Sequence, residues 1–240
     1  MELVPAYRAR VLDALREAAR AARAALRPAR SASGYGRSEV TVNRRLALPD
    51  GRVVVSQNWD GYRDPVLSVL RIDRLDGQPI ATIVGYGTHP IVLAHENRLV
   101  SPDYPGHLKR VVEQAMGGHC LFLQGCAGDQ IPREALVADP GAPRRMGTEI
   151  GLDAARVAIG LSTRRIRKRF DHVVESGAPL GIWVDDELPA PAQVIAVESR
   201  RIALPVRAYG DVEELDAQSE AATAAVRAID RSVATPAELA

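Results

Sequence analysis

Two short segments of this chain combine residue types that enzymes use for hydrolysis. Thr88-His89-Pro90 follows an apolar run over residues 80–86, and a glycine-rich stretch over residues 125–129 ends in Asp129. An imidazole at the end of a strand can bind zinc or transfer a proton. A carboxylate in a flexible loop can orient a histidine or act as a base. The sequence therefore predicts a candidate site in which His89 could bind a metal ion or transfer a proton and Asp129 could orient a histidine or act as a base.

Both residues also have a plainer interpretation. His89 could be a partly buried histidine bonded to backbone, and Asp129 could cap a turn. His95 and His107 lie close to His89 in the sequence, but their spacing matches no recurrent zinc motif.

A second group of polar residues is predicted to face the substrate. Asn43 and Arg44 lie within a predicted strand, where a fixed guanidinium could clamp an anionic group. The alternative is an edge strand facing solvent. Asn97, Ser101 and Asp103 follow His89 and are predicted to shape the pocket, although Asp103 could simply be the N-cap of a helix.

Alternating apolar patterns predict an α/β fold, with a mixed β-sheet, hairpins and flanking helices. Asp50-Gly51 and Asp76-Gly77 predict two antiparallel hairpins. Residues 31–36 are predicted to form a turn, and residues 178–191 a variable loop. The predicted helices cover residues 5–26, 104–116, 144–161 and 211–229, and the predicted strands cover residues 40–48, 52–57, 66–72, 79–86, 120–123, 170–174 and 201–207.

Composition narrows the class of protein. The chain has 240 residues, 46% of them apolar, and a formal net charge of +1, which argues against general nucleic-acid binding. No apolar run reaches the roughly 18 residues of a membrane span, and the N-terminus lacks the apolar core of a secretory signal. The default compartment is therefore the cytoplasm. Two cysteines do not make a disulfide framework, and the common phosphate-loop, dinucleotide, G-x-S-x-G, HExxH and CxxC motifs do not occur.

Four motifs in one order resemble the N-terminal catalytic domain of the neutral/alkaline non-lysosomal ceramidase family. They are NRR at 43–45, GTHP at 87–90, NRLVSPDYPG at 97–106 and QGCAGDQIP at 124–132. The resemblance covers residues 5–210 and implies a zinc-dependent amidase that acts on ceramide or another linear amide, in sphingolipid or other lipid metabolism. It implies that His89 binds zinc and that Asp129 is the aspartate of a Gly-Asp-x-Ser-Pro motif. Family members are often secreted.

The chain departs from the family pattern in two ways. The serine of that motif falls on Ile131, so a zinc-bound hydroxide would have to attack directly. The family's T-H-T-H segment and its later glutamate and tyrosine ligands have no equivalent here. We therefore expect residues 1–240 to be a single, partial ceramidase-like domain, a fragment whose other zinc ligands lie outside it and which is inactive in isolation.

Three readings of function remain at this point. The first is an incomplete amide hydrolase, and the second is a non-catalytic remnant or binding module that keeps the scaffold without metal. The third is a lipid-surface binder through the basic run at 164–169, which could instead be a solvated helix end. A missing strand would also expose sheet edges and favour self-association.

Overall fold

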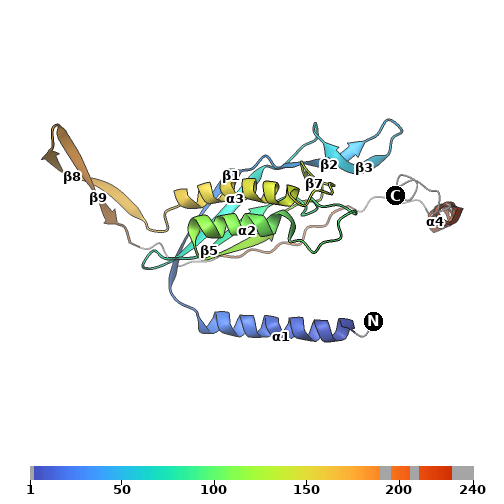
Figure 1. Ribbon diagram of the computed structural model, residues 1–240, viewed down its shortest axis with the longest axis horizontal. Coiled ribbons are helices and arrows are strands. Elements are labelled where there is room, and N and C mark those ends of the chain that lie inside the picture. Colours follow the sequence, from blue (N-terminus) through green and yellow to red (C-terminus); the bar gives the residue numbers. More distant parts are fainter. Residues whose placement is uncertain (1–2, 190–195, 206–210, 229–240) are drawn as a thin grey trace. The chain divides into compact units, whose positions relative to one another are not determined.

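A computed structural model describes residues 3–189, 196–205 and 211–228 (Figure 1). The chain divides into two units, residues 1–190 and residues 191–240. The prediction of a single partial domain over residues 1–240 stays a prediction. Helix α4 (Val212–Ala228) belongs to the second unit, and all other elements belong to the first.

The main sheet has four strands, in the order β1-β4-β5-β6. Its strands are β1 (Ala29–Arg37), β4 (Val66–Arg74), β5 (Pro79–Tyr86) and β6 (His119–Gln124). The pairs β1–β4 and β4–β5 are antiparallel, whereas β5 and β6 run parallel and are joined through helix α2 (Asp103–Met116). The predicted α/β class with a mixed sheet is confirmed.

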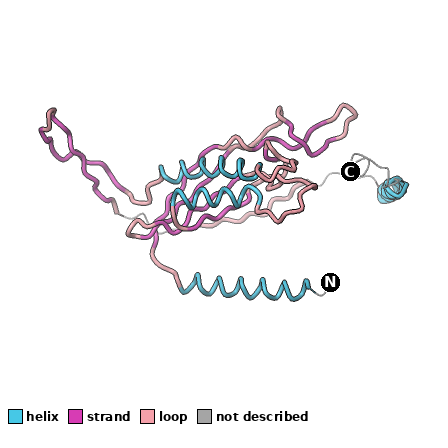
Figure 2. Tube along the Cα trace, in the orientation of Figure 1, coloured by secondary structure: helices cyan, strands magenta, loops and turns pink. Residues whose placement is uncertain are grey.

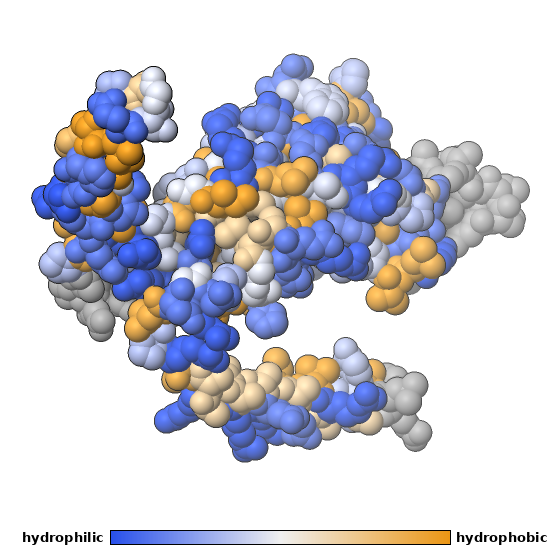
Figure 3. Space-filling model, turned by 60° about the vertical axis from the view of Figure 1, so that its left-hand side comes forward, coloured by the Kyte–Doolittle hydropathy of each residue, from blue (hydrophilic) through white to orange (hydrophobic). Residues whose placement is uncertain are grey.

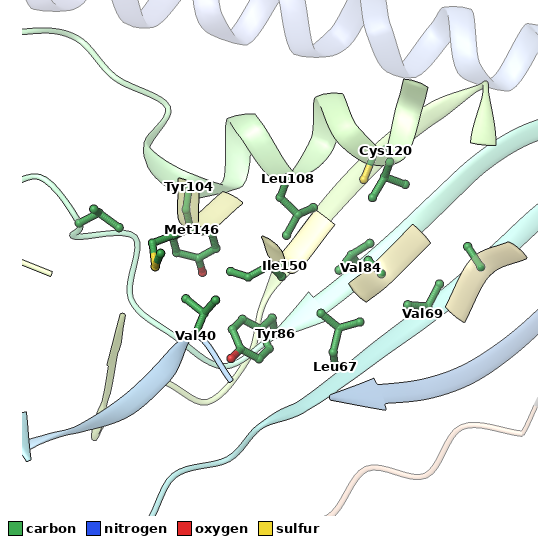
Figure 4. Close-up of a cluster of buried hydrophobic side chains, with 14 of the residues drawn as sticks. Val40, Leu67, Val69, Val84, Tyr86, Tyr104, Leu108, Cys120, Met146 and Ile150 are labelled. Atoms are coloured by element: carbon green, nitrogen blue, oxygen red, sulfur yellow. The ribbon is translucent and has the colours of Figure 1, made fainter. Parts of the chain in front are cut away.

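Helices α2 and α3 (Ala142–Gly160) lie side by side on one face of this sheet (Figure 1). Every second residue of β4 and β5 points to the helices, so Leu67, Val69, Val84 and Tyr86 form one buried cluster with Leu108 and Ile150 (Figure 4). Tyr104 from α2 meets Phe122 from β6 edge to face, with ring centroids 5.7 Å apart. This core fixes the end of the sheet at which β5 and β6 stop.

A smaller sheet, in the order β3-β2-β7, carries Asn43 and Arg44. Its strands are β2 (Thr41–Ala47), β3 (Val53–Asn58) and β7 (Gln130–Pro132), and both pairings are antiparallel. The two predicted hairpins, β2–β3 and β4–β5, are confirmed. The edge-strand alternative is wrong for Asn43, which pairs with both β3 and β7, whereas Arg45 pairs with β3 alone and is exposed.

A third, two-stranded sheet pairs β8 (Ile166–Glu175) with β9 (Pro179–Glu187). The predicted loop over residues 178–191 is therefore wrong for residues 179–187. The exposed rings of Phe170 and Trp183 pair across it at 5.7 Å. Helix α1 (Leu3–Ala24) is exposed along its described side chains, with apolar groups on one side and charged groups on the other (Figure 3).

Two further predictions need correction. Residues 31–36 form part of β1 and not a turn, because they pair with β4. The glycines leave room for α3 instead, since a Cβ on Gly36 would lie 2.6 Å from the Val157 side chain. Residues 201–205 are not a strand, and residues 206–207 lie outside the described residues.

Candidate functional site

The site begins where the parallel strands β5 and β6 end. Tyr86 and Gln124 are paired in register as their last residues, and the Gly125 N–H donates to the Tyr86 carbonyl at 3.0 Å. A Cβ on Gly87 would lie 2.7 Å from the Cys126 carbonyl oxygen, so the two loops touch at a position that only glycine fits. The loops carrying His89 and Asp129 thus leave the same edge of the sheet together, near β7 (Figure 2).

Three hydrogen bonds hold the backbone around His89. The carbonyl oxygen of Thr88 accepts the Tyr104 hydroxyl at 2.7 Å and the Gln124 amide at 3.0 Å. The His89 N–H donates to the Gln130 carbonyl at 3.5 Å. The imidazole is therefore carried by a peptide that both α2 and β6 fix.

The imidazole of His89 has an unusual environment. Its Nε2 is buried and has no hydrogen-bond partner among the described residues. Burial, followed by the nearby positive charge of Arg44, lowers the pKa of His89. A neutral imidazole with an unengaged nitrogen can bind a metal ion or accept a proton.

The loop that carries Asp129 is attached to β2 through Arg44. The Arg44 N–H donates to the Asp129 carbonyl at 2.8 Å, and the Arg44 Nε donates to the Gly128 carbonyl at 3.1 Å. The carboxylate Oδ1 of Asp129 accepts the Gln130 side-chain amide at 2.8 Å. Arg44 therefore holds the Asp129 loop through hydrogen bonds, and its charge lowers the pKa of His89.

Asn43 is buried, with 8% of its surface exposed. Its Oδ1 accepts the Arg45 N–H at 2.8 Å, and its Nδ2 donates to the Tyr62 carbonyl at 2.9 Å. Both ends of the amide are engaged by backbone, so Asn43 holds the segment that follows β3 in place. Its position next to Gln130 in the β2–β7 pairing keeps it beside the site.

The other three predicted site residues belong to the segment between β5 and α2. Asn97 bonds to Leu99 through both ends of its amide, and the Ser101 hydroxyl accepts the Asp103 N–H at 3.0 Å. Asp103 is 8% exposed, and its carboxylate accepts the N–H groups of Leu93 and Tyr104. These contacts shape that segment, and none of them joins it directly to His89 or Asp129 among the described residues.

Asp103 differs from the predicted N-cap. Helix α2 begins at Asp103 itself, and the cap position is Pro102. Asp103 has a φ of 47°, in the left-handed region that is uncommon for residues other than glycine. Its carboxylate fixes the first turn of α2, from which Tyr104 reaches the Thr88 carbonyl.

Sequence reasoning missed three residues that position the site: Gln130, Tyr104 and Gln124. Gln130 and Tyr104 are almost fully buried, and each bonds to a residue that lies far away in the sequence. Residue type and spacing carry no signal for such contacts, because the pairing of β2 with β7 is apparent only once the chain is folded.

Ile131, at the position of the family serine, is fully buried and packs with Val42 and Ala135 in a second small core cluster. It supplies no hydroxyl and faces away from solvent. The described residues also contain no group of three or more His, Cys, Asp or Glu side chains placed to hold a metal ion. His89 suits a metal ligand by itself, but these residues do not complete a coordination set.

The basic run at 164–169 is not a helix end, since residues 166–169 lie on β8. Asp185 pairs with Lys168, Asp186 pairs with Arg167 and Arg169, and Glu187 pairs with Arg164. The acidic strand β9 thus offsets most of the positive charge that would attract an anionic surface. No helix among the described residues is long and apolar enough to cross a bilayer.

No family model and no curated protein matches this chain. Among solved structures, it is similar to two ceramidases. The neutral ceramidase from Pseudomonas aeruginosa is 26% identical, with a TM-score of 0.43, and a ceramidase complexed with C2 is also 26% identical, with a TM-score of 0.44. Each alignment covers 63% of this chain and 26% of the ceramidase chain, so this chain spans about a quarter of their length.

Proposed function

We propose that this chain carries part of the active site of a hydrolase that cleaves ceramide-like amides. The observation that carries the proposal is the buried, unpartnered Nε2 of His89, held beside Arg44 and the Asp129 loop at the ends of β5 and β6. The four family motifs support it as well, because three of them, NRR, GTHP and QGCAGDQIP, meet at this point.

We further propose that His89 is a zinc ligand. Its lowered pKa keeps the imidazole neutral, the form that binds metal, and the remaining ligands would come from outside the described residues. Bound zinc lowers the pKa of its water and polarises a carbonyl.

The chain's own residues have separate tasks in this proposal. Arg44 donates from its Nε to the Gly128 carbonyl, and in this proposal the rest of its guanidinium binds the carbonyl or an anionic group of the substrate. Asp129 holds a water molecule or receives a proton through Oδ2, because Oδ1 already accepts the Gln130 amide. Buried Ile131 excludes a hydroxyl nucleophile at its own position.

Metal analysis of the purified chain, with amide hydrolysis measured on a short-chain fluorescent N-acylsphingosine, tests this proposal. We expect His89→Ala to remove bound zinc and any hydrolysis, while the control His172→Ala, on an exposed histidine of β8, retains both. Equal zinc content and equal hydrolysis in the two variants would contradict a role for His89.

A second candidate, a non-catalytic scaffold, is favoured by the absence of a metal-binding group among the described residues and by Ile131 in the core. It predicts no zinc in the wild-type chain even with zinc in excess. Stoichiometric zinc would exclude it.

A further inference from the structure

Gln130 is a buried residue of β7 whose contacts reach β2 and both candidate loops. It is 1% exposed, and its side-chain amide makes three hydrogen bonds. Its Oε1 accepts the Thr41 hydroxyl at 3.2 Å and the Asp64 N–H at 3.1 Å, and its Nε2 donates to Asp129 Oδ1 at 2.8 Å. A buried amide with both ends satisfied has one stable orientation.

The direction of this amide follows from its partners. The Asp64 backbone N–H can only donate, so the atom that faces it must be the Gln130 oxygen. The NH₂ group is then directed at the Asp129 carboxylate. The reverse orientation would place two donors against each other at Asp64 and two acceptors against each other at Asp129.

The backbone of the same residue reaches His89. The Gln130 carbonyl accepts the His89 N–H at 3.5 Å, and the preceding carbonyl, that of Asp129, accepts the Arg44 N–H at 2.8 Å. One buried residue therefore contacts the loops of both candidate groups, through its side chain in one case and its backbone in the other.

We propose that Gln130 is a positioning residue that locks the Asp129 carboxylate into one orientation and leaves Oδ2 as its reactive oxygen. The catalytic role of this orientation rests on the proposed function, whereas the orientation itself concerns only Gln130 and Asp129. A carboxylate that is aimed in advance loses less freedom when it engages substrate or water than one that rotates freely.

The test is the rotamer of Asp129, measured by three-bond N–Cγ and C′–Cγ couplings in the isotope-labelled chain. In the wild-type protein we expect a single staggered χ1 rotamer. In Gln130→Met, which removes all three hydrogen bonds, we expect the couplings to average over several wells. Gln130→Glu, which keeps the size but turns an oxygen toward Asp129, should also drive the carboxylate out of its rotamer.

Thr41→Val is the matched control. It removes one bond to Oε1 from the same buried network, but the Asp64 N–H still fixes the amide direction, so the Asp129 rotamer should stay unchanged. Averaged couplings in the wild-type chain, or a single unchanged rotamer in Gln130→Glu, would overturn the inference. If Gln130→Met does not fold, the rotamer of Asp129 in Gln130→Glu still tests the inference.

Hydrolysis gives a separate readout. Where the wild-type chain cleaves the amide substrate, Gln130→Glu should lower kcat by about 10–100-fold with little change in KM, as is typical of residues that orient a reacting group. A wild-type chain that takes up no zinc even with zinc in excess, but has a fixed Asp129 rotamer, would count against the proposed function and leave the positioning role standing. If a variant changes the Asp129 rotamer but leaves kcat unchanged, the orientation set by Gln130 has no effect on catalysis.

Discussion

At the scale of single residues, the proposed chemistry depends most on His89 and Arg44. Two effects keep this imidazole neutral: burial, which is the larger, and the positive charge of Arg44. Arg44 is available for this role because its backbone and its Nε are both tied to the Asp129 loop. Arg44 thus acts on the histidine through the charge of its guanidinium, and on the loop through hydrogen bonds from its Nε and its backbone N–H.

We expect Arg44→Gln to raise the pKa of His89, because the mutation removes a like charge that disfavours the imidazolium form. The pKa can be followed by NMR of the imidazole nitrogens across a pH titration. Arg45→Gln, at the exposed neighbouring position, should leave the titration of His89 unchanged. Equal shifts of the His89 pKa in both variants would indicate that the overall positive charge of the region lowers this pKa, and not Arg44 in particular.

The hydroxyl of Tyr104 offers a second test at this scale. Burial raises the pKa of Tyr104, so its hydroxyl stays protonated and donates to the Thr88 carbonyl. Tyr104→Phe should reduce the free energy of unfolding by about 1–2 kcal/mol in urea titrations. Tyr35→Phe, on a side chain that is 80% exposed, should change it by less than about 0.5 kcal/mol.

At the scale of elements, the close approach of α2 and α3 determines where the site forms. Gly147 on α3 faces α2 so closely that a Cβ there would lie 2.6 Å from the Cβ of His107. This contact stabilises the first turn of α2, which carries Tyr104 and begins at the strained residue Asp103. The helix pair is therefore the support for the His89 loop.

Gly147→Ala should cost about 1–3 kcal/mol of unfolding free energy, because the two helices must move apart to admit the methyl group. Gly160→Ala, at the end of the same helix with no atom within 4 Å of the added Cβ, should be neutral or stabilise by up to about 1 kcal/mol. Chemical denaturation of both variants gives the comparison, and a similar loss in both would refute the steric explanation.

Sequence patterns identified most elements because their signals are local. Asp50-Gly51 and Asp76-Gly77 mark tight turns, and each of these glycines has a positive φ. The failures have non-local causes. Gly34 and Gly36 looked like turn residues but make room for α3, and β9 depends on pairing with β8. His89 and Asp129 were predicted from residue type, whereas Gln130 could not be, because its partners Thr41 and Asp64 lie far from it in the sequence.

At the scale of the whole molecule, one face of the main sheet carries the helices, and the opposite face carries its own apolar row. Leu70, Ile83 and Leu121 are cross-strand neighbours on that face, since they alternate with residues that point to the helices. Leu121 and Leu123, on the end strand β6, are 51% and 58% exposed. Such a row on an end strand favours association between copies.

We expect the chain to self-associate in size-exclusion chromatography with light scattering, and Leu121→Lys to shift it toward the monomer. Leu152→Lys, which changes a 59% exposed leucine on α3 instead, is the control and should leave the distribution unchanged. A wild-type chain that elutes as a clean monomer with a cooperative melt would contradict this prediction.

The contacts that assemble the site also have a kinetic consequence. Arg44 and Gly128 are 84 positions apart in the chain, and Thr41 and Gln130 are 89 positions apart. Closing loops of that length is slow and entropically costly, so these contacts form after the hairpins and after the passage of the chain from β5 through α2 to β6. They are also anchored by β7, a strand of three residues. The amides of β7 should accordingly exchange with deuterium sooner than those at the centre of β4 and β5, so the structure opens first at the place where the proposed chemistry resides.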